Sequence, residues 1–112
     1  EQIEKICKYL ENHFFRNITL DELSLAAGFS KYYLLRTFTK VKGISPHKYL
    51  ETVRIEKSKK MLEEGMPIID IALKTGFTDQ SHFTNLFKSL IGLTPKSYQK
   101  VIKEAGNMEG KV

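Results

Sequence analysis

The chain nearly repeats itself, and this repeat limits its possible folds more than any other feature of the sequence. At an offset of 48 residues, Leu20, Leu23, Leu25, Gly28 and Phe29 match Ile68, Ile71, Leu73, Gly76 and Phe77. After one inserted residue, Leu34, Phe38, Gly43, Ser45, Pro46 and Tyr49 match Phe83, Phe87, Gly92, Thr94, Pro95 and Tyr98 at an offset of 49. Self-similarity of this kind indicates two copies of one supersecondary unit.

The pattern of apolar residues predicts helices throughout the chain. Ile3, Ile6, Cys7, Leu10 and Phe14 recur at three- and four-residue spacing, which is typical of one buried helix face. Cys7 is therefore interpreted as a small buried hydrophobe. The segment from Thr19 to Glu22 fits a capping box, and Gly28 can end the helix that follows. We expect an all-α fold of about seven helices.

Each copy contains a short helix, a glycine turn and a longer helix, which is the pattern of a helix-turn-helix. We expect the longer helices at about residues 30–42 and 79–91, with Leu34, Phe38 and Val41 buried in the first and Phe83, Phe87 and Leu90 in the second. The predicted parts are a first helix-turn-helix subdomain (residues 1–45), a linking helix (46–64) and a second subdomain (65–112), which ends in a short frayed tail from about Glu104.

The positive charge is concentrated in one part of the chain. The 112 residues carry a formal net charge of +5, but residues 30–60 hold nine bases and two acids, or +7. A concentrated excess favours a polyanionic partner, although a solvated lysine-rich surface is the alternative. No apolar run approaches the roughly 18 residues of a membrane span. The single cysteine fits a reducing cytoplasm, and the chain, which begins with Glu1, is expected to be a piece of a longer protein.

Several motifs together resemble the DNA-binding domain of the AraC/XylS family of bacterial transcription regulators, over about residues 2–99. The resemblance is carried by residues 23–30, Phe38, 70–72, 76–83, 87–88, Gly92 and 94–98. It implies sequence-specific binding of double-stranded promoter DNA, usually for activation, by a cytoplasmic, nucleoid-associated protein. It also implies contacts with RNA polymerase and a separate upstream sensor domain that this chain lacks.

The buried faces of the two longer helices determine which side chains point outward. The candidate base contacts are Lys31, Tyr32, Leu35, Arg36, Gln80, Ser81, Thr84 and Asn85. The candidate phosphate contacts are Ser30, Thr39, Lys40, Lys42, Arg54 and Lys88. Arg36 suits guanine, while Gln80 and Asn85 suit adenine. Leu35 suits a thymine methyl group or completes the core, and Arg54 contacts phosphate or pairs with an acid.

The length of the linking helix supports a bipartite reader of DNA. About eighteen residues span roughly 27 Å at 1.5 Å per residue, and successive major grooves on one face of DNA lie roughly 34 Å apart. With packing offsets, the two recognition helices would enter successive grooves. Because residues 79–91 contain one acid and one base, we expect the first unit to anchor binding and the second to read DNA more weakly.

Other functions find less support in the sequence. An enzyme is not expected, because His13, His47 and His82 lie far apart and no nucleophile motif, metal-ligand spacing or cofactor loop is present. A helical protein-interaction module is the alternative, with Tyr32, Tyr33 and Leu35 as its apolar patch. RNA binding would be expected to use more outward aromatic residues.

Overall fold

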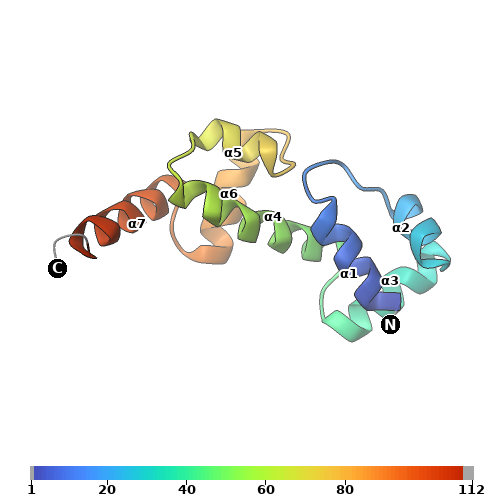
Figure 1. Cartoon of the computed structure of the whole chain (residues 1–112). Helices are drawn as coiled ribbons and strands as arrows, with labels where there is room; N and C mark the ends of the chain where they lie inside the picture. The colour runs from blue at the N-terminus through green and yellow to red at the C-terminus, as the bar shows by residue number, and fades with distance from the viewer. Residues whose placement is uncertain (1, 110–112) are drawn as a thin grey trace. The chain divides into compact units, whose positions relative to one another are not determined.

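In the computed structural model, which describes residues 2–109, all regular elements of the described residues are α-helices (Figure 1). In chain order they are α1 (Gln2–Asn12), α2 (Leu20–Ala27), α3 (Lys31–Lys42), α4 (Pro46–Glu63), α5 (Ile68–Lys74), α6 (Gln80–Ile91) and α7 (Pro95–Glu109). The prediction of an all-α fold with about seven helices is confirmed. No helix of the described residues is long and apolar enough to cross a membrane.

The chain divides into two compact units, and the division falls inside α4, between Arg54 and Ile55. Unit 1 therefore contains α1, α2, α3 and the first half of α4, whereas unit 2 contains the second half of α4 together with α5, α6 and α7. Each unit has a separate cluster of buried apolar side chains.

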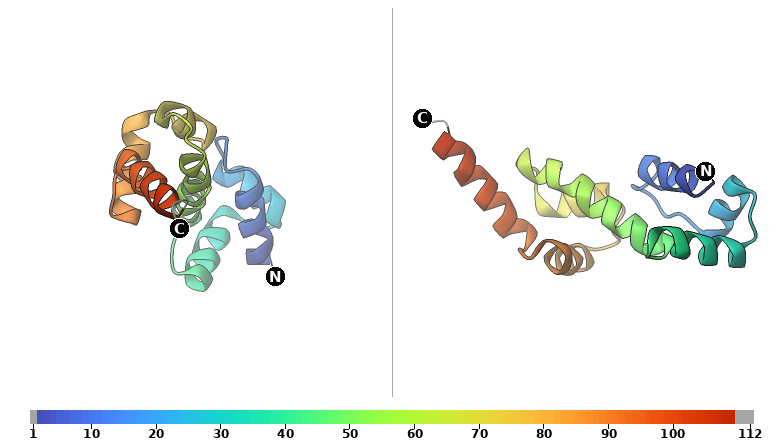
Figure 2. Two further views of the ribbon diagram at one scale, coloured as in Figure 1. Left: turned by 60° about the vertical axis from the view of Figure 1, so that its left-hand side comes forward. Right: turned by 90° about the horizontal axis from the view of Figure 1, so that it is seen from below.

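The core of unit 1 is formed where α2 and α3 pack on α1, and the chain path through these helices can be followed in Figure 2. The apolar stripe of α1 (Ile3, Ile6, Cys7 and Leu10) meets Leu23 and Ala27 of α2, Leu34 and Phe38 of α3, and Leu50 of α4. Full burial of one such side chain is worth about 1.5–3 kcal/mol relative to exposure. This cluster is therefore what holds α3 in place.

Local capping fixes where α2 and α3 begin. The Thr19 hydroxyl accepts a hydrogen bond from the backbone N–H of Glu22 at 3.1 Å, as the capping box predicts. The Ser30 hydroxyl accepts from the N–H of Tyr33 at 3.2 Å and begins α3. Between the two helices, Gly28 has a φ of 74°, a left-handed conformation that glycine adopts without strain. The turn of the first helix-turn-helix is thus set by nearby residues.

The core of unit 2 is built from the matching positions of the repeat. Ile71 of α5 and Phe83 and Phe87 of α6 are fully buried, at positions that correspond to Leu23, Leu34 and Phe38. In place of α1, the second half of α4 contributes the buried side chains of Ile55 and Leu62. Asp79 caps α6 by accepting from the N–H of His82 at 2.7 Å.

Two expectations about buried residues are wrong. Val41 and Leu90 are 59% and 46% exposed, and the buried residues of their helices are Leu34 and Phe38 in α3 and Phe83 and Phe87 in α6. The segment from Glu104 to Glu109, where the sequence predicts a frayed tail, is the end of α7. The rest of the predicted tail lies outside the described residues.

Candidate nucleic-acid interface

One face of α3 presents the predicted residues of the first recognition helix to solvent. Lys31, Tyr32, Leu35, Arg36, Thr39 and Lys40 are all exposed and lie at i, i+1, i+4, i+5, i+8 and i+9. This spacing places them in one stripe along the helix, opposite the buried Leu34 and Phe38. The helix is therefore anchored by an apolar face and offers hydrogen-bond donors and three cations on the other.

A matching stripe lies on α6. Gln80, Ser81, Asn85 and Lys88 are exposed and Thr84 is half-buried, at i, i+1, i+5, i+8 and i+4. Phe83 and Phe87 fill the core behind them, with their ring centroids 5.8 Å apart. Lys88 is the only charged residue of α6, so this face is rich in amide and hydroxyl groups rather than in cations.

Two of the predicted lysines are already paired with acids. Lys31 Nζ lies 3.0 Å from Asp21 Oδ1 of α2, and Lys42 Nζ lies 3.0 Å from Glu4 Oε2 of α1. The bond to Lys42 lowers the pKa of Glu4, and the same bond raises the pKa of Lys42. An anionic ligand that binds either lysine must therefore compete with a carboxylate of unit 1.

Leu35 has a partly apolar environment that explains a leucine at this outward position. It is 40% exposed and lines a cavity of about 360 Å³ in unit 1. The other walls include Leu10 of α1, Leu23 of α2 and Pro46 and Leu50 of α4. Leu35 therefore lies at the edge of the core, where one side of it remains open to a ligand.

The prediction that Arg54 contacts phosphate is wrong, because its side chain is only 8% exposed. Its Nε donates to the carbonyl oxygen of Phe14 at 2.8 Å, and its Nη2 donates to that of Arg16 at 2.9 Å. Burial lowers the pKa of Arg54. The guanidinium thus binds the backbone of its own unit, where backbone oxygens compensate for the lost hydration.

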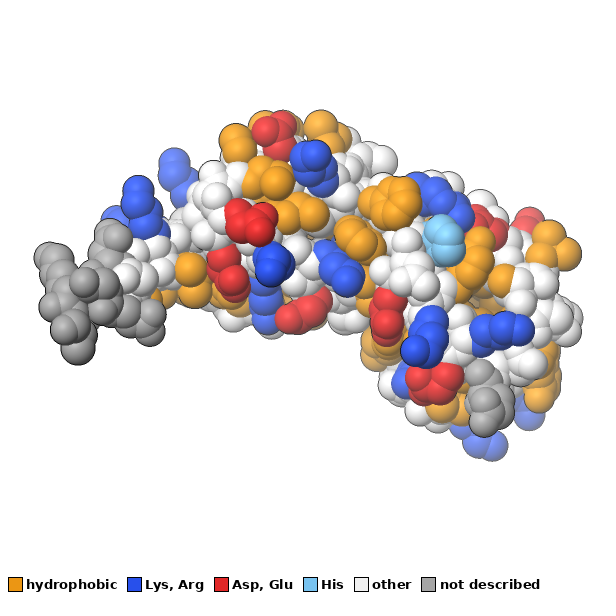
Figure 3. Space-filling view, viewed as in Figure 1, with side chains coloured by type: hydrophobic (Ala, Val, Ile, Leu, Met, Phe, Trp, Pro, Cys, Tyr) orange, Lys and Arg blue, Asp and Glu red, His pale blue; other side chains and the backbone are white. Residues whose placement is uncertain are grey.

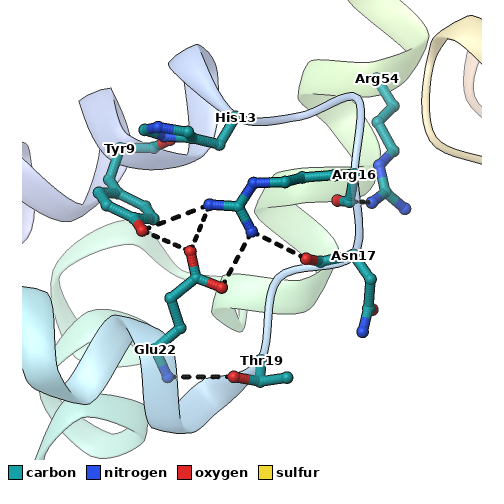
Figure 4. Close-up of polar contacts among 7 residues, drawn as sticks. All are labelled: Tyr9, His13, Arg16, Asn17, Thr19, Glu22 and Arg54. Atoms are coloured by element: carbon teal, nitrogen blue, oxygen red, sulfur yellow. Dashed lines mark hydrogen bonds and ion pairs between the residues drawn. The ribbon is translucent and has the colours of Figure 1, made fainter.

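Figure 4 shows a polar network next to Arg54 that the sequence pattern does not predict. Arg16 and Glu22 form two bonds, Nη1 to Oε1 at 3.0 Å and Nη2 to Oε2 at 2.5 Å, and the Tyr9 hydroxyl also donates to Glu22. The hydrogen bonds from Arg16 lower the pKa of Glu22 to about 2. Because Arg16 lies between helices, no helical spacing could reveal this pair.

The surface of the second unit carries apolar side chains outside its recognition helix. Hydrophobic side chains are visible over α5 in Figure 3, in agreement with the 48% and 56% exposure of Ile69 and Leu73.

Among the described residues, no three or more His, Cys, Asp or Glu side chains are grouped so that they could hold a metal ion.

Solved structures share this arrangement of helices. A probable AraC family transcriptional regulator from Rhodopseudomonas palustris CGA009 superposes with a TM-score of 0.84 at 23% identity, over 90% of this chain and 96% of that one. The DNA-binding domain of AdpA, solved in complex with a target DNA, superposes with a TM-score of 0.87 at 19% identity, over 94% of this chain and 96% of that one. At these identities the likeness concerns the fold.

A family model described as a helix-turn-helix domain matches residues 23–101, which is most of the chain. The chain belongs to the AraC-type helix-turn-helix family. The matched segment begins within α2 and ends in α7, so it includes both recognition helices and the whole of α4. The resemblance seen in the sequence is thereby confirmed, and the chain is a DNA-binding domain of this type.

The relatives of this AraC-type domain include regulators that are much longer than the chain. An uncharacterized HTH-type transcriptional regulator of Bacillus subtilis (strain 168), YbfI, is 52% identical over 82 residues, which cover 73% of this chain and 30% of that protein. The chain therefore spans less than a third of the length of this relative.

Proposed function

We propose that this domain reads a specific sequence of double-stranded DNA by placing α3 and α6 in successive major grooves. The observation that supports this most directly is the pair of matching stripes. Each unit buries two large apolar residues of its recognition helix and exposes hydrogen-bonding side chains on the opposite face. A major groove accepts one α-helix, and its base edges offer the donors and acceptors that such a stripe can read.

In this proposal the bases are contacted by Lys31, Tyr32, Leu35 and Arg36 of α3 and by Gln80, Ser81, Thr84 and Asn85 of α6. Arg36 is exposed, and its forked donors fit O6 and N7 of guanine. Gln80 and Asn85 fit N6 and N7 of adenine. The open side of Leu35 fits the methyl group of thymine, while its other side stays in the cavity wall.

The phosphates are contacted by Ser30, Thr39, Lys40, Lys42 and Lys88, without Arg54. Such contacts fix the register of the domain on the duplex and make the affinity depend on salt. Lys40 is exposed, whereas Lys42 is held by Glu4 in the absence of DNA. Four of these five residues belong to α3 or its N-cap, so we assign most of the electrostatic anchoring to unit 1.

We further propose that the domain works within a longer cytoplasmic regulator that binds promoter DNA on the nucleoid, activates transcription and contacts RNA polymerase. A sensor domain elsewhere in that regulator would control it. The length of YbfI supports the presence of further domains, since this chain matches 30% of it. The domain acts by binding and not by catalysis.

The experiment that tests this function is selection from a random pool of double-stranded DNA at about 0.15 M salt, followed by sequencing. We expect two enriched blocks whose centres are about one helical turn, or roughly 10 base pairs, apart. Duplex RNA of matched sequence serves as the competitor and should not displace the selected DNA. If nothing is enriched and binding disappears as salt rises, the domain does not read sequence, and the protein-interaction module takes its place.

A further inference from the structure

Arg54 connects α4 to the segment that leads from α1 to α2. Arg54 donates hydrogen bonds to the carbonyl oxygens of Phe14 and Arg16, which both lie in this segment, at 2.8 and 2.9 Å. The five N–H donors of a guanidinium form a rigid planar fork, which can donate to two carbonyls in one fixed geometry. The backbone of the segment is therefore held at two points by a buried side chain.

The connection continues from this segment into the helix-turn-helix. The side chain of Arg16, whose carbonyl Arg54 binds, forms the two bonds to Glu22 in the first turn of α2 (Figure 4). Thr19, at the end of the same segment, caps α2 by accepting a hydrogen bond from the backbone N–H of Glu22. Since α2 contacts α3 directly, the chain of polar contacts leads from α4 to the helix that packs on the recognition helix.

Unit 2 contains a counterpart made by a different residue. The side-chain amide of Gln99 in α7 donates to the carbonyl oxygens of Leu62 and Met66 at 3.1 and 3.0 Å. Leu62 is the residue that matches Phe14 at the offset of 48. Met66 and Gln99 do not occupy the repeat positions of Arg16 and Arg54, and Leu62 lies in the last turn of α4. The two units thus share the kind of contact, in which a polar side chain on the helix after the recognition helix binds two carbonyls before the helix-turn-helix, and not the residue that makes it.

We propose that Arg54 and Gln99 are positioning residues, which set how α3 and α6 are presented to DNA. Each one holds the entry to the helix-turn-helix of its own unit, and neither touches the bases. This inference rests on the proposed reading of DNA. It separates Arg54 from the phosphate-binding lysines, because a positioning residue changes the fit to the bases but releases no counterions when DNA binds.

The test compares Arg54→Lys, Arg54→Met and Gln99→Met with the wild-type chain and with Lys40→Met as a matched control. Lysine keeps the charge of Arg54 but not its two-carbonyl geometry, and Gln99→Met keeps the length of the side chain. Three quantities are measured: the slope of log affinity against log salt, the affinity cost of single base changes in each block of the selected duplex, and hydrogen exchange of backbone amides without DNA.

For Arg54→Lys we expect an affinity about tenfold lower, the equivalent of one hydrogen bond to a charged group, with the salt slope unchanged. In this variant, single base changes in the block read by α3 should lower the affinity by a smaller factor than they do in the wild type. Base changes in the block read by α6 should lower it by the same factor as in the wild type. In Gln99→Met, the smaller effect of base changes should be found in the block read by α6, and the block read by α3 should be unaffected. Lys40→Met should lower the salt slope by about 0.9 and leave the base preferences unchanged.

Hydrogen exchange, measured in the absence of DNA, tests the positioning role directly. We expect faster exchange in α2 and α3 for both Arg54 variants and in α5 and α6 for Gln99→Met. The proposal is overturned if the Arg54 variants lower the salt slope, if both blocks lose discrimination equally, or if exchange in these helices is unchanged. If the wild-type chain fails to select any duplex, the proposed function fails, and the exchange pattern still decides whether these residues hold the helices.

Discussion

At the scale of single residues, the charge of a side chain does not show whether it is available to bind DNA until its neighbours are known. Lys31 and Arg36 both lie on the exposed stripe of α3, but Lys31 is paired with Asp21 at 3.0 Å. Both partners are largely exposed, so the pair itself adds little stability. Its importance lies in binding, because Asp21 places a negative charge beside a surface that is proposed to meet phosphates and bases.

Replacing Asp21 with asparagine should therefore strengthen DNA binding. Removal of one acid near the interface frees Lys31 and reduces repulsion of the duplex, so we expect an affinity about two- to fivefold higher at low salt, with a smaller gain at about 0.5 M salt. Titration of the selected duplex by fluorescence anisotropy measures this. Glu64→Gln, which removes the same charge from unit 2, is the control. An equal gain in both variants would mean that only net charge matters.

Arg36 allows a sharper prediction at the same scale. Arg36→Ala should cost about 1–3 kcal/mol of binding free energy and relax the preference at one guanine position. Affinities for four duplexes that differ at that position measure the effect. Lys40→Ala, on the same stripe, should weaken all four duplexes by a similar factor. If Arg36→Ala also weakens all four equally, Arg36 contacts a phosphate and not a base.

At the scale of elements, the start of α2 depends on one carboxylate. Bonds from Arg16 and Tyr9 and the Thr19 backbone lower the pKa of Glu22 to about 2. A group whose pKa is lower in the folded state stabilises that state above its unfolded pKa, and this stabilisation is lost as the pH falls through the folded pKa. For Glu22 the loss should run from about pH 4.3, the ordinary value of glutamate, down to about pH 2.

Glu22→Gln should thus lower the urea midpoint of unit 1 at pH 7, while the gap between variant and wild type should narrow steadily below about pH 4. Urea unfolding at a series of pH values, followed by tyrosine fluorescence or circular dichroism, measures this difference in midpoint. Glu63→Gln, an exposed acid of α4, is the control. A gap that stays constant down to pH 2.5 would contradict a role of the ionised carboxylate.

The ends of the recognition helices should tolerate substitutions that their centres do not. Phe38 is fully buried and Val41, three residues further along, is 59% exposed. Phe38→Ala should lower the free energy of unfolding by about 3–5 kcal/mol, whereas Val41→Ala should change it by less than about 0.5 kcal/mol. Thermal or urea unfolding distinguishes the two. A large loss for Val41→Ala would show that the last turn of α3 is packed after all.

The same contrast explains which parts of the structure the sequence could predict. The cap at Thr19 and the turn at Gly28 depend on residues within a few positions, so the pattern alone was sufficient. Val41 continues the apolar spacing of α3, and nothing local reveals that the core ends at Phe38. Arg54 looks like a surface base until its two carbonyl partners, 38 and 40 positions away, are known. The sequence pattern does not predict contacts between side chains and partners that lie far away along the chain.

At the scale of the whole molecule, the two units are alike in fold and unlike in charge. The cores use matching positions of the repeat, yet α3 contains Lys31, Arg36, Lys40 and Lys42, while α6 contains Lys88 alone. Cations bound to phosphates supply most of the salt-dependent affinity of a DNA-binding protein. The repeat therefore preserves the packing that presents each recognition helix, while the exposed faces of the two helices differ in charge.

This difference predicts unequal contributions from the two half-sites. Base changes in the block read by α3 should each cost about 1–3 kcal/mol, and changes in the block read by α6 should cost less than about 1 kcal/mol. A scan of all single substitutions in the selected duplex measures both, and the loss of preference in Arg36→Ala identifies the block that belongs to α3. Because α6 carries amides and hydroxyls that adapt to several bases, its block should also accept more than one base at most positions. Equal costs in the two blocks would mean that hydrogen bonding by α6 matches the charge of α3, and the anchoring role of unit 1 would then be wrong.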